Sequence, residues 1–543
     1  MRVITVILLA FLAYSNAQDL VVTIPQGSLR GFVDIDRIGN EFYSFMNIPY
    51  AVPPLGDLRF RAPIPAGNWE GIREVNNVIP ACVQCGFGGC PGTEDCLYLN
   101  VYTPQFPNQN NTLKPVMVDI HGGAFTGGSA GDGPHFLITK DVIVATINYR
   151  LGIFGSFSVD DPELGVPGNA GMKDQSLAIK WIHDNIRYFG GDPNNIMIFG
   201  DSAGAASVHL QVLSPMSKGI FQKALCQSGV ALFDLMNGVR NNGILMAQQL
   251  GIQTQNLSEM LNSLQQIPAF DILLAEQALT GEFPLISTPL VEIESNEPAF
   301  LPDEIITLIQ TGNYNHVPFV IGHNNAEGLF IHIPVKLMTG QNITITDFTG
   351  YIPPDLQIQP GSEEEAIIAA RIREFYYGDT EPSPSDITQA IQLITDYTFA
   401  FPSYRAAKEH LKTAQYPIYF YYFSSDTLLN IFKRVEEVAA NFPGASHTDE
   451  KAHLFRFGNT PDIQPGSVEE QALERLVTLW TNFAKYSTPT TQSDDVIWES
   501  ITEETFKYLH FDTYQSTLQT GAPQPANMAF WEQLYDEFFP GKL

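Results

Sequence analysis

The chain has 543 residues, of which 44% are hydrophobic and 16% are charged, and its formal net charge is −30. This apolar content is normal for a folded protein, and the length accommodates about three average domains or one large enzyme fold. Acidic residues outnumber basic residues by 59 to 29. The composition therefore excludes nucleic acid as the main partner, because phosphate binding needs a basic face, and it disfavours docking to anionic membranes.

The N-terminus has the composition of a secretory signal peptide. Residues 3–12 are almost purely apolar, and Ser15 and Ala17 are small residues at the two positions that a signal peptidase reads. The apolar run is too short to span a bilayer, which takes about 20 residues. We therefore expect a signal peptide over residues 1–17 and a secreted, extracellular chain over 18–543 without a membrane anchor.

Cysteine usage agrees with an oxidising compartment. Four of the five cysteines crowd into fifteen residues: Cys82, Cys85, Cys90 and Cys96. A disulfide-stapled loop is the favoured interpretation, with three possible pairings. A zinc site is the alternative, although Cys90 and Cys96 are spaced too widely for a zinc knuckle. Cys226 lies in an apolar run and is expected to be a buried free thiol.

Three N-x-[ST] sequons are candidate glycosylation sites in an exported chain: Asn110, Asn256 and Asn342.

The remaining sequence alternates short β-branched runs with longer amphipathic ones. Apolar runs predict six strands, at 115–120, 142–148, 196–199, 222–226, 317–321 and 417–423. Helical periodicity is found at residues 174–189 and 468–486, and the weakly patterned stretch 237–315 is expected to hold inserted helices. Strands alternating with helices predict a single α/β domain with a mostly parallel central sheet.

The pattern G-x-S-x-G occurs twice, around Ser129 and around Ser202. At this glycine content roughly 0.2 chance matches are expected, so the context must decide between the two copies. A nucleophile elbow is a tight turn between a strand and a helix. Ser202 has that context, with an apolar strand before it and residues 203–213 able to form a helix after it. Ser129 is followed by an Asp-Gly-Pro segment that blocks a helix, so we interpret it as part of a glycine-rich loop.

Acyl transfer also requires hydrogen-bond donors for an oxyanion. The segment 121–125 (HGGAF) directly follows a predicted strand, and its small residues leave backbone N–H groups free to point at one spot. The N–H of Ala203, after the nucleophile, would be the third donor.

Folds built around such an elbow order their triad as serine, acid and histidine along the chain. Glu327 lies in the loop after the predicted strand at 317–321, which makes it the candidate acid. His447 lies in a loop of small and polar residues after the strand at 417–423, where a catalytic imidazole is expected. His332 is too close to Glu327 in sequence, and His410 lies in a helical stretch.

With these features together, the chain resembles the type-B carboxylesterases of the cholinesterase-like α/β-hydrolase family, and most of all the secreted insect carboxylesterases. The likeness extends from residue 27 to about 538. It rests on GSLRG at 27–31, IPYA at 48–51, EDCLYLN at 94–100, NYRLG at 148–152 and GNAGMKDQ at 168–175.

The resemblance implies an α/β-hydrolase fold, a triad of Ser202, Glu327 and His447, and no metal or cofactor. It also implies an oxyanion hole formed by the N–H groups of Gly123, Ala124 and Ala203. The disulfide that it implies is Cys82–Cys96, and the ion pairs are Arg59–Glu94 and Arg150–Asp174. An additional Cys85–Cys90 bridge would lie outside the family pattern.

Two departures from relatives bear on the substrate. Juvenile hormone esterases typically carry Gln before the nucleophile, where this chain has Asp201, and cholinesterases bind a quaternary ammonium on a Trp that the loop 83–95 lacks. Apolar recognition is expected instead, from Phe125, Phe233, Phe399 and Phe401.

We therefore predict a secreted serine carboxylesterase that hydrolyses uncharged esters through an acyl-enzyme, as a monomer or weak dimer. Three alternatives stay open: a juvenile hormone, odorant or pheromone esterase as the specific role, a lipase, and a non-catalytic adhesion or binding relative.

Overall fold

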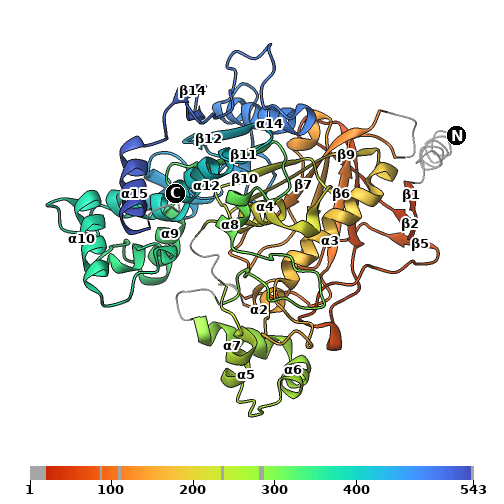
Figure 1. The fold of residues 1–543 in the computed structure, drawn as a ribbon. Coiled ribbons are helices and arrows are strands. Elements are labelled where there is room, and N and C mark those ends of the chain that lie inside the picture. Colours follow the sequence, from red (N-terminus) through yellow and green to blue (C-terminus); the bar gives the residue numbers. More distant parts are fainter. Residues whose placement is uncertain (1–19, 86–88, 108–111, 234–237, 281–285, 540–543) are drawn as a thin grey trace.

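The computed structural model describes residues 20–85, 89–107, 112–233, 238–280 and 286–539. A twisted eleven-stranded sheet runs through the middle of the molecule (Figure 1). Its strands in spatial order are β14 (Ser516–Thr520), β13 (Lys507–Phe511), β12 (Ile418–Phe423), β11 (Phe319–Asn324), β10 (Lys223–Gln227), β9 (Gly191–Asp201), β7 (Lys114–Ile120), β8 (Ile143–Ile147), β6 (Tyr98–Thr103), β4 (Glu41–Pro49) and β3 (Phe32–Ile35).

The sheet is parallel in its centre and antiparallel at both edges. Neighbouring strands from β13 to β8 run parallel, whereas β14 and the β6–β4–β3 edge pair antiparallel. A second, three-stranded sheet lies near the N-terminus and contains β1 (Val21–Ile24), β2 (Gly27–Arg30) and β5 (Ile72–Glu74). The six predicted strands all overlap strands of the large sheet, so the predicted α/β fold is confirmed.

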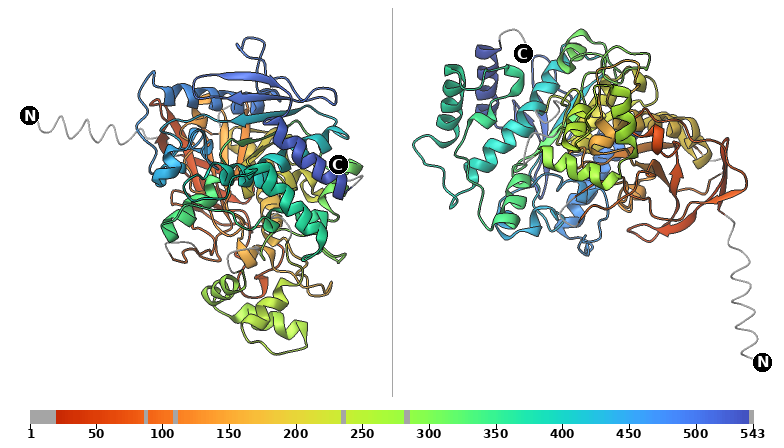
Figure 2. Two further views of the ribbon diagram at one scale, coloured as in Figure 1. Left: turned by 90° about the vertical axis from the view of Figure 1, so that its left-hand side faces the viewer. Right: turned by 90° about the horizontal axis from the view of Figure 1, so that it is seen from below.

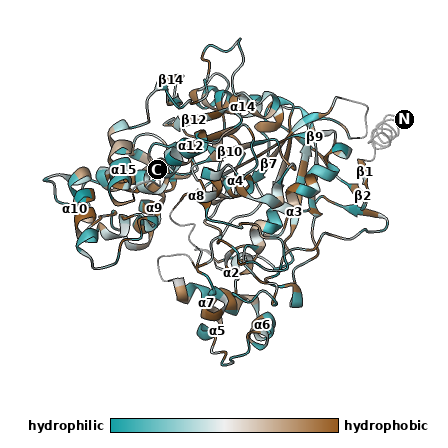
Figure 3. Cartoon of the chain, viewed as in Figure 1, coloured by the Kyte–Doolittle hydropathy of each residue, from teal (hydrophilic) through white to brown (hydrophobic). Residues whose placement is uncertain are grey.

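Helices cover both faces of the sheet, and the two-residue period of the strands explains why. In β7, Val116 and Val118 pack on the face covered by α3 (Ala170–Asn185) and α4 (Ala203–Leu213). Met117 points to the other face, which α14 (Val468–Tyr486) covers. The apolar and polar residues of these helices can be followed in Figure 3. The strands are thus buried on both sides, as expected for parallel strands.

Two groups of helices are inserted at the carboxyl ends of the central strands. After β10 come α5 (Asn242–Gln249), α6 (Leu257–Gln266), α7 (Ala269–Thr280) and α8 (Ile305–Thr311), which confirms the predicted insertion. After β11 come α9 (Leu329–Thr339), α10 (Glu363–Tyr377), α11 (Thr388–Thr395) and α12 (Phe401–Leu411). Only α12 was anticipated, through the helical stretch around His410. Further α-helices of the described residues are α2 (Gly152–Ser156), α13 (Glu437–Asn441) and α15 (Pro525–Phe538).

The two insertions form separate lobes (Figure 2). Helices α5–α7 lie at one end of the molecule, and α9 and α10 lie with the C-terminal α15 at another. Among the described residues, no helix combines the length and the apolar composition needed to cross a membrane.

Candidate active site

Ser202 occupies a sharp turn between β9 and α4. Its backbone angles, φ 58° and ψ −127°, are rare for a residue with a side chain. Two hydrogen bonds hold the turn, from the Ser202 N–H to the carbonyl of Gln227 (2.9 Å) and from the Ala206 N–H to the carbonyl of Ser202 (3.0 Å). Such a strained conformation persists only where its surroundings fix it, and it is common at functional sites. The turn has the geometry of a nucleophile elbow.

The glycines on either side of Ser202 are required by close packing. A Cβ atom at Gly200 would lie 2.4 Å from the carbonyl oxygen of Ile120, and a Cβ at Gly204 would lie 2.0 Å from the same oxygen. Because that oxygen belongs to the backbone of β7, it cannot move away by a change of side-chain rotamer. The nucleophile turn and the end of β7 are therefore in direct contact, and the loop that follows β7 begins beside Ser202.

That loop carries the predicted oxyanion donors. Gly123, Ala124 and Phe125 have φ angles of 113°, 53° and 60°. The turn is held by hydrogen bonds from the N–H groups of Thr126 and Gly127 to the carbonyl of Gly123, at 3.0 and 2.9 Å. Within the described ranges, the N–H groups of Gly123, Ala124 and Ala203 donate no hydrogen bond to the protein. Three free donors close to a serine are what a tetrahedral oxyanion needs.

Glu327 and His447 form a buried hydrogen-bonded pair. Glu327 lies just after β11 and is fully buried, and its Oε2 is 2.6 Å from Nδ1 of His447. Its Oε1 accepts a hydrogen bond from the N–H of Asn324 at 2.6 Å, which fixes the carboxylate. In the part of the chain that the structure describes, Nε2 of His447 is buried without a hydrogen-bond partner. Glu327 thus orients the imidazole, and the opposite ring nitrogen is free to take a proton.

Two other acids lie near this pair, and their environments distinguish them from Glu327. Burial, followed by the charge of Glu327, raises the pKa of Glu450 well above its usual value. Burial raises the pKa of Asp449 to about 7, and its carboxylate accepts the N–H of Ser446 at 2.8 Å. Asp449 therefore shapes the histidine loop, whereas burial and the charge of Glu327 disfavour the charged form of Glu450.

An ion pair connects the histidine loop to the nucleophile elbow. Lys451, four residues after His447, places its Nζ 2.8 Å from Oδ1 of Asp201, the residue before Ser202. Both side chains are buried. Sequence reasoning missed Lys451, although a lone lysine in a predicted histidine loop was a possible signal.

Aromatic rings surround His447. The ring of Phe399 lies 4.4 Å from the imidazole and that of Phe330 lies 5.1 Å from it, centroid to centroid. Phe233 stacks on Phe399 at 5.1 Å. Phe330 was not predicted, although it follows Glu327 by only three residues.

The prediction that Phe401 lines this pocket is wrong. Its ring packs against Trp531 and Tyr535 of α15, with centroid distances of 6.0 and 5.3 Å. Phe401 begins α12, two residues beyond Phe399 in the π-helical turn Asp396–Ala400, and the two rings contact different neighbours. Phe125 is buried, and it lines a cavity of about 10 Å³ beside α2 and α3.

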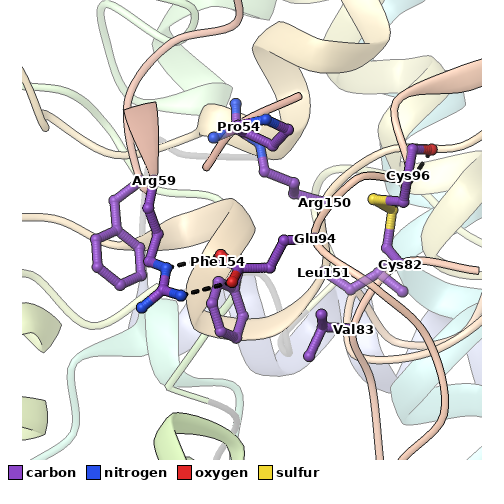
Figure 4. A pocket seen from close by; sticks show the side chains of 10 residues that line it. Pro54, Arg59, Cys82, Val83, Glu94, Cys96, Arg150, Leu151 and Phe154 are labelled. Atoms are coloured by element: carbon purple, nitrogen blue, oxygen red, sulfur yellow. Dashed lines mark hydrogen bonds and ion pairs between the residues drawn. A yellow bond between two sulfur atoms is a disulfide. The ribbon is translucent and has the colours of Figure 1, made fainter. Parts of the chain in front are cut away.

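The four clustered cysteines form two disulfides, Cys82–Cys96 and Cys85–Cys90. The zinc alternative is therefore wrong, and Cys226 is a buried free thiol, as predicted. Beside Cys82–Cys96, Nε of Arg59 donates to Glu94 at 2.7 Å (Figure 4). The cavity drawn there holds only about 10 Å³, the size of a single water, so this loop offers no substrate pocket at that point.

A second ion pair, between Arg150 and Asp174, is fully buried, with two side-chain contacts of 2.7 Å. In the described residues, no group of three or more histidine, cysteine, aspartate or glutamate side chains is arranged to hold a metal ion.

Comparison with known proteins gives one consistent family. The model of the carboxylesterase family matches residues 18–531. A carboxylic ester hydrolase of Bombus ignitus is 34% identical, covering 98% of each chain, and a juvenile hormone esterase of Tribolium castaneum is 33% identical, covering 88% of this chain and 85% of the other. The crystal structure of the juvenile hormone esterase from Manduca sexta, with OTFP covalently attached, superimposes with a TM-score of 0.83. It is 29% identical and covers 96% of this chain and 100% of the other.

Proposed function

This chain belongs to the carboxylesterase family and is a serine hydrolase of carboxylic esters, and we propose that it hydrolyses uncharged esters through an acyl-enzyme on Ser202. The observation that carries this proposal is the Glu327–His447 hydrogen bond, together with the free Nε2 of His447. An imidazole held at one nitrogen and open at the other is the form required of a general base.

In the proposed reaction, the hydroxyl of Ser202 attacks the ester carbonyl while Nε2 of His447 takes its proton. Glu327 stabilises the imidazolium that forms. The N–H groups of Gly123, Ala124 and Ala203 bind the negative oxygen of the tetrahedral intermediate. The imidazolium then gives its proton to the departing alcohol, and water releases the acid by the same route.

The direct test is labelling with a fluorophosphonate probe followed by peptide mass spectrometry. We expect one label per chain, on Ser202, because the probe reacts with the serine that forms the acyl-enzyme. A label on Ser129, or turnover in a chain that takes no label, would contradict the mechanism. The same labelling separates this function from the adhesion alternative, for which no label is expected.

The preference for uncharged esters is supported by the phenylalanine rings of Phe233, Phe330 and Phe399 around His447. A Trp face binds a quaternary ammonium best, an attraction of about 0.5–2 kcal/mol. The net charge of −30 acts in the opposite direction by steering cations toward the protein, but salt screens that effect. At physiological ionic strength we expect kcat/KM for p-nitrophenyl butyrate to exceed that for butyrylthiocholine. Equal or faster turnover of the choline ester would contradict this preference.

Juvenile hormone is a second candidate substrate, because two relatives carry the name juvenile hormone esterase. The opposing observation is Asp201, which pairs with Lys451 where those esterases typically carry glutamine. Hydrolysis of juvenile hormone with a KM far below that for p-nitrophenyl butyrate would make the hormone the substrate of choice.

Export is part of the proposal, with cleavage after Ala17 and an extracellular destination. Of the sequons, Asn110 lies outside the described residues. Asn256 is exposed, whereas the side-chain N–H of Asn342 donates to the carbonyl of Pro384 at 2.8 Å. A glycan occupies that side-chain nitrogen, so we expect occupancy at Asn256 and little at Asn342. N-terminal sequencing and glycopeptide mass spectrometry of the secreted protein test both statements.

A further inference from the structure

A buried lysine lies among three aspartates behind the proposed nucleophile. The Nζ of Lys451 is 2.8 Å from Asp201, 3.4 Å from Asp132 and 3.6 Å from Asp119. Lys451, Asp119 and Asp201 are 5%, 2% and 5% exposed, and Asp132 is partly buried. Ions so deep in a protein are expensive, and they persist only when they are paired. We call these four residues the Lys451 cluster.

The strand pattern explains why the aspartates meet. Asp119 is the last residue but one of β7, and Asp201 is the last residue of β9. The two strands are adjacent and parallel, and Phe199, two residues before Asp201, pairs with Asp119 in the register. Residues two apart share a face, so both carboxylates lie on the α14 side of the sheet at its carboxyl edge. Lys451 reaches this edge from the histidine loop, and its ammonium also lies 5.5 Å from the ring centroid of Phe455.

Three parts of the proposed active site therefore meet at one ammonium. Asp201 is bonded to the nucleophile residue, Asp119 lies two residues before the oxyanion loop, and Lys451 follows His447 by four residues. The carboxylate of Asp201 also lies against the oxyanion loop, because a Cβ at Gly122 would be 2.9 Å from its Oδ2. A negative charge at this place opposes the negative charge that develops on the substrate oxygen.

We propose that Lys451 is a positioning residue that locks the nucleophile elbow to the histidine loop and neutralises Asp201 beside the oxyanion hole. The inference rests on the proposed function, since it presumes that the oxyanion forms next to Ser202. It extends that function by assigning a role to an ion cluster that takes no part in the proton transfers.

The charge states fit this role. Burial alone would lower the pKa of Lys451, but the charges of Asp119, Asp201 and Asp132 raise it well above its usual value. Burial alone would raise the pKa of Asp201, but the ammonium of Lys451 outweighs it and lowers the pKa. Burial raises the pKa of Asp119 to about 7 and also raises that of Asp132. Further titratable groups that face the cluster are His121, whose pKa burial lowers to about 4, Tyr149, whose pKa burial raises, and His447 and Glu450 of the histidine loop, which face Asp201. The Lys451–Asp201 pair is therefore ionised at neutral pH.

The experiment replaces Lys451 by methionine, which keeps the length of the side chain and removes the charge. Fluorophosphonate titration counts the active sites, so that kcat is expressed per competent site. We expect kcat per site to fall by roughly ten- to a hundredfold, less than the roughly 10²- to 10³-fold loss caused by removing an oxyanion donor, with a smaller change in KM. The loss should grow as the pH rises, because Asp201 without its partner ionises at higher pH and then opposes the oxyanion.

A second substitution tests that cause. The double variant Lys451→Met/Asp201→Asn lacks the carboxylate that lies against Gly122, so we expect it to recover activity relative to Lys451→Met at alkaline pH and to lose the alkaline decline. Lys173→Met is the matched control, because Lys173 of α3 is also buried and forms a 2.8 Å ion pair with Glu292. It should lose stability while keeping the wild-type kcat per site and pH profile.

The proposal is overturned if Lys451→Met behaves like Lys173→Met, with lower stability but an unchanged kcat per site and pH profile. If Lys451→Met does not accumulate as folded protein, Lys451→Met/Asp119→Asn removes one buried carboxylate and is held to the same expectations. Failure of the proposed function looks different, since the wild-type protein would then take no label at Ser202.

Discussion

The pattern G-x-S-x-G occurs at residues 127–131 and 200–204, and the two copies fold differently. Around Ser202 the backbone turns sharply from a strand into a helix, with Gly200 and Gly204 pressed against the carbonyl of Ile120. Around Ser129 the chain is an irregular loop, and a Cβ at Gly131 would meet only the Ser129 hydroxyl at 3.5 Å. The motif is therefore a site only where the sheet and the following helix force the turn.

Replacing each serine gives the largest contrast between the two copies. Ser202→Ala should lower kcat for p-nitrophenyl butyrate by roughly 10⁴-fold or more, because no other group can form the acyl-enzyme. Ser129→Ala should keep an activity near that of the wild type. Thermal unfolding of both variants shows whether the fold is intact. A larger loss in Ser129→Ala would reverse the assignment of the two copies.

Substituting the proposed partners of Ser202 should give the second largest loss of activity, since only this copy of the motif is proposed to act with a histidine and an acid. Glu327→Gln should lower kcat by roughly 10³- to 10⁴-fold, because the amide cannot stabilise the imidazolium. Glu450→Gln is the matched control, since burial and the charge of Glu327 raise the pKa of Glu450 and disfavour its charged form. Glu450→Gln should lower kcat less than Glu327→Gln does. A larger loss of kcat in Glu450→Gln would identify Glu450 as the acid of the triad.

The glycines separate the copies by stability. In Gly204→Ala the new methyl group would lie 2.0 Å from a backbone oxygen, so the variant should lose about 1–3 kcal/mol or more of unfolding free energy. Gly131→Ala meets only an ordinary contact and should stay within about 0.5 kcal/mol of the wild type. Urea denaturation measures both values. Equal losses would show that the loop copy is as tightly packed as the elbow.

The helix after Ser202, which has no counterpart after Ser129, adds a smaller and pH-dependent contribution to the free energy of unfolding. His209 of α4 contacts His410 at 2.7 Å, and burial lowers its pKa from 6.5 to about 3. Between these values the unfolded chain binds a proton that the folded one does not, so the stability that His209 contributes is present above about pH 6.5 and is lost as the pH falls toward 3. His209→Gln should therefore reduce the slope of unfolding free energy against pH by up to about 1.4 kcal/mol per unit. An unchanged slope between pH 6.5 and 4 would mean that His209 is protonated in the folded protein.

Local patterns predicted the elbow, the loop at 121–125 and the strands, because strand periodicity, glycines and a following helix are properties of neighbouring residues. The Glu327–His447 pair could be proposed only from the order of the elements along the chain. The position of Phe401 was predicted wrongly because the rotation of a helical segment is set by packing against α15. The role of Lys451 could not be predicted for a related reason, since its aspartate partners lie 250 or more residues away in sequence.

The 2.6 Å bond between Glu327 and His447 joins residues 120 positions apart, and its consequence concerns the growing chain. Ser202 and the loop at 121–125 belong to the first half, and they can take shape once β10 has been synthesised. The acid, Glu327, arrives after the first helical insertion and β11, whereas the base, His447, arrives only after the second insertion and β12. A nascent or truncated chain that stops before residue 447 would thus display the nucleophile without the group that activates it. Hydrolytic power would then appear late in biosynthesis, when the C-terminal half folds onto the first.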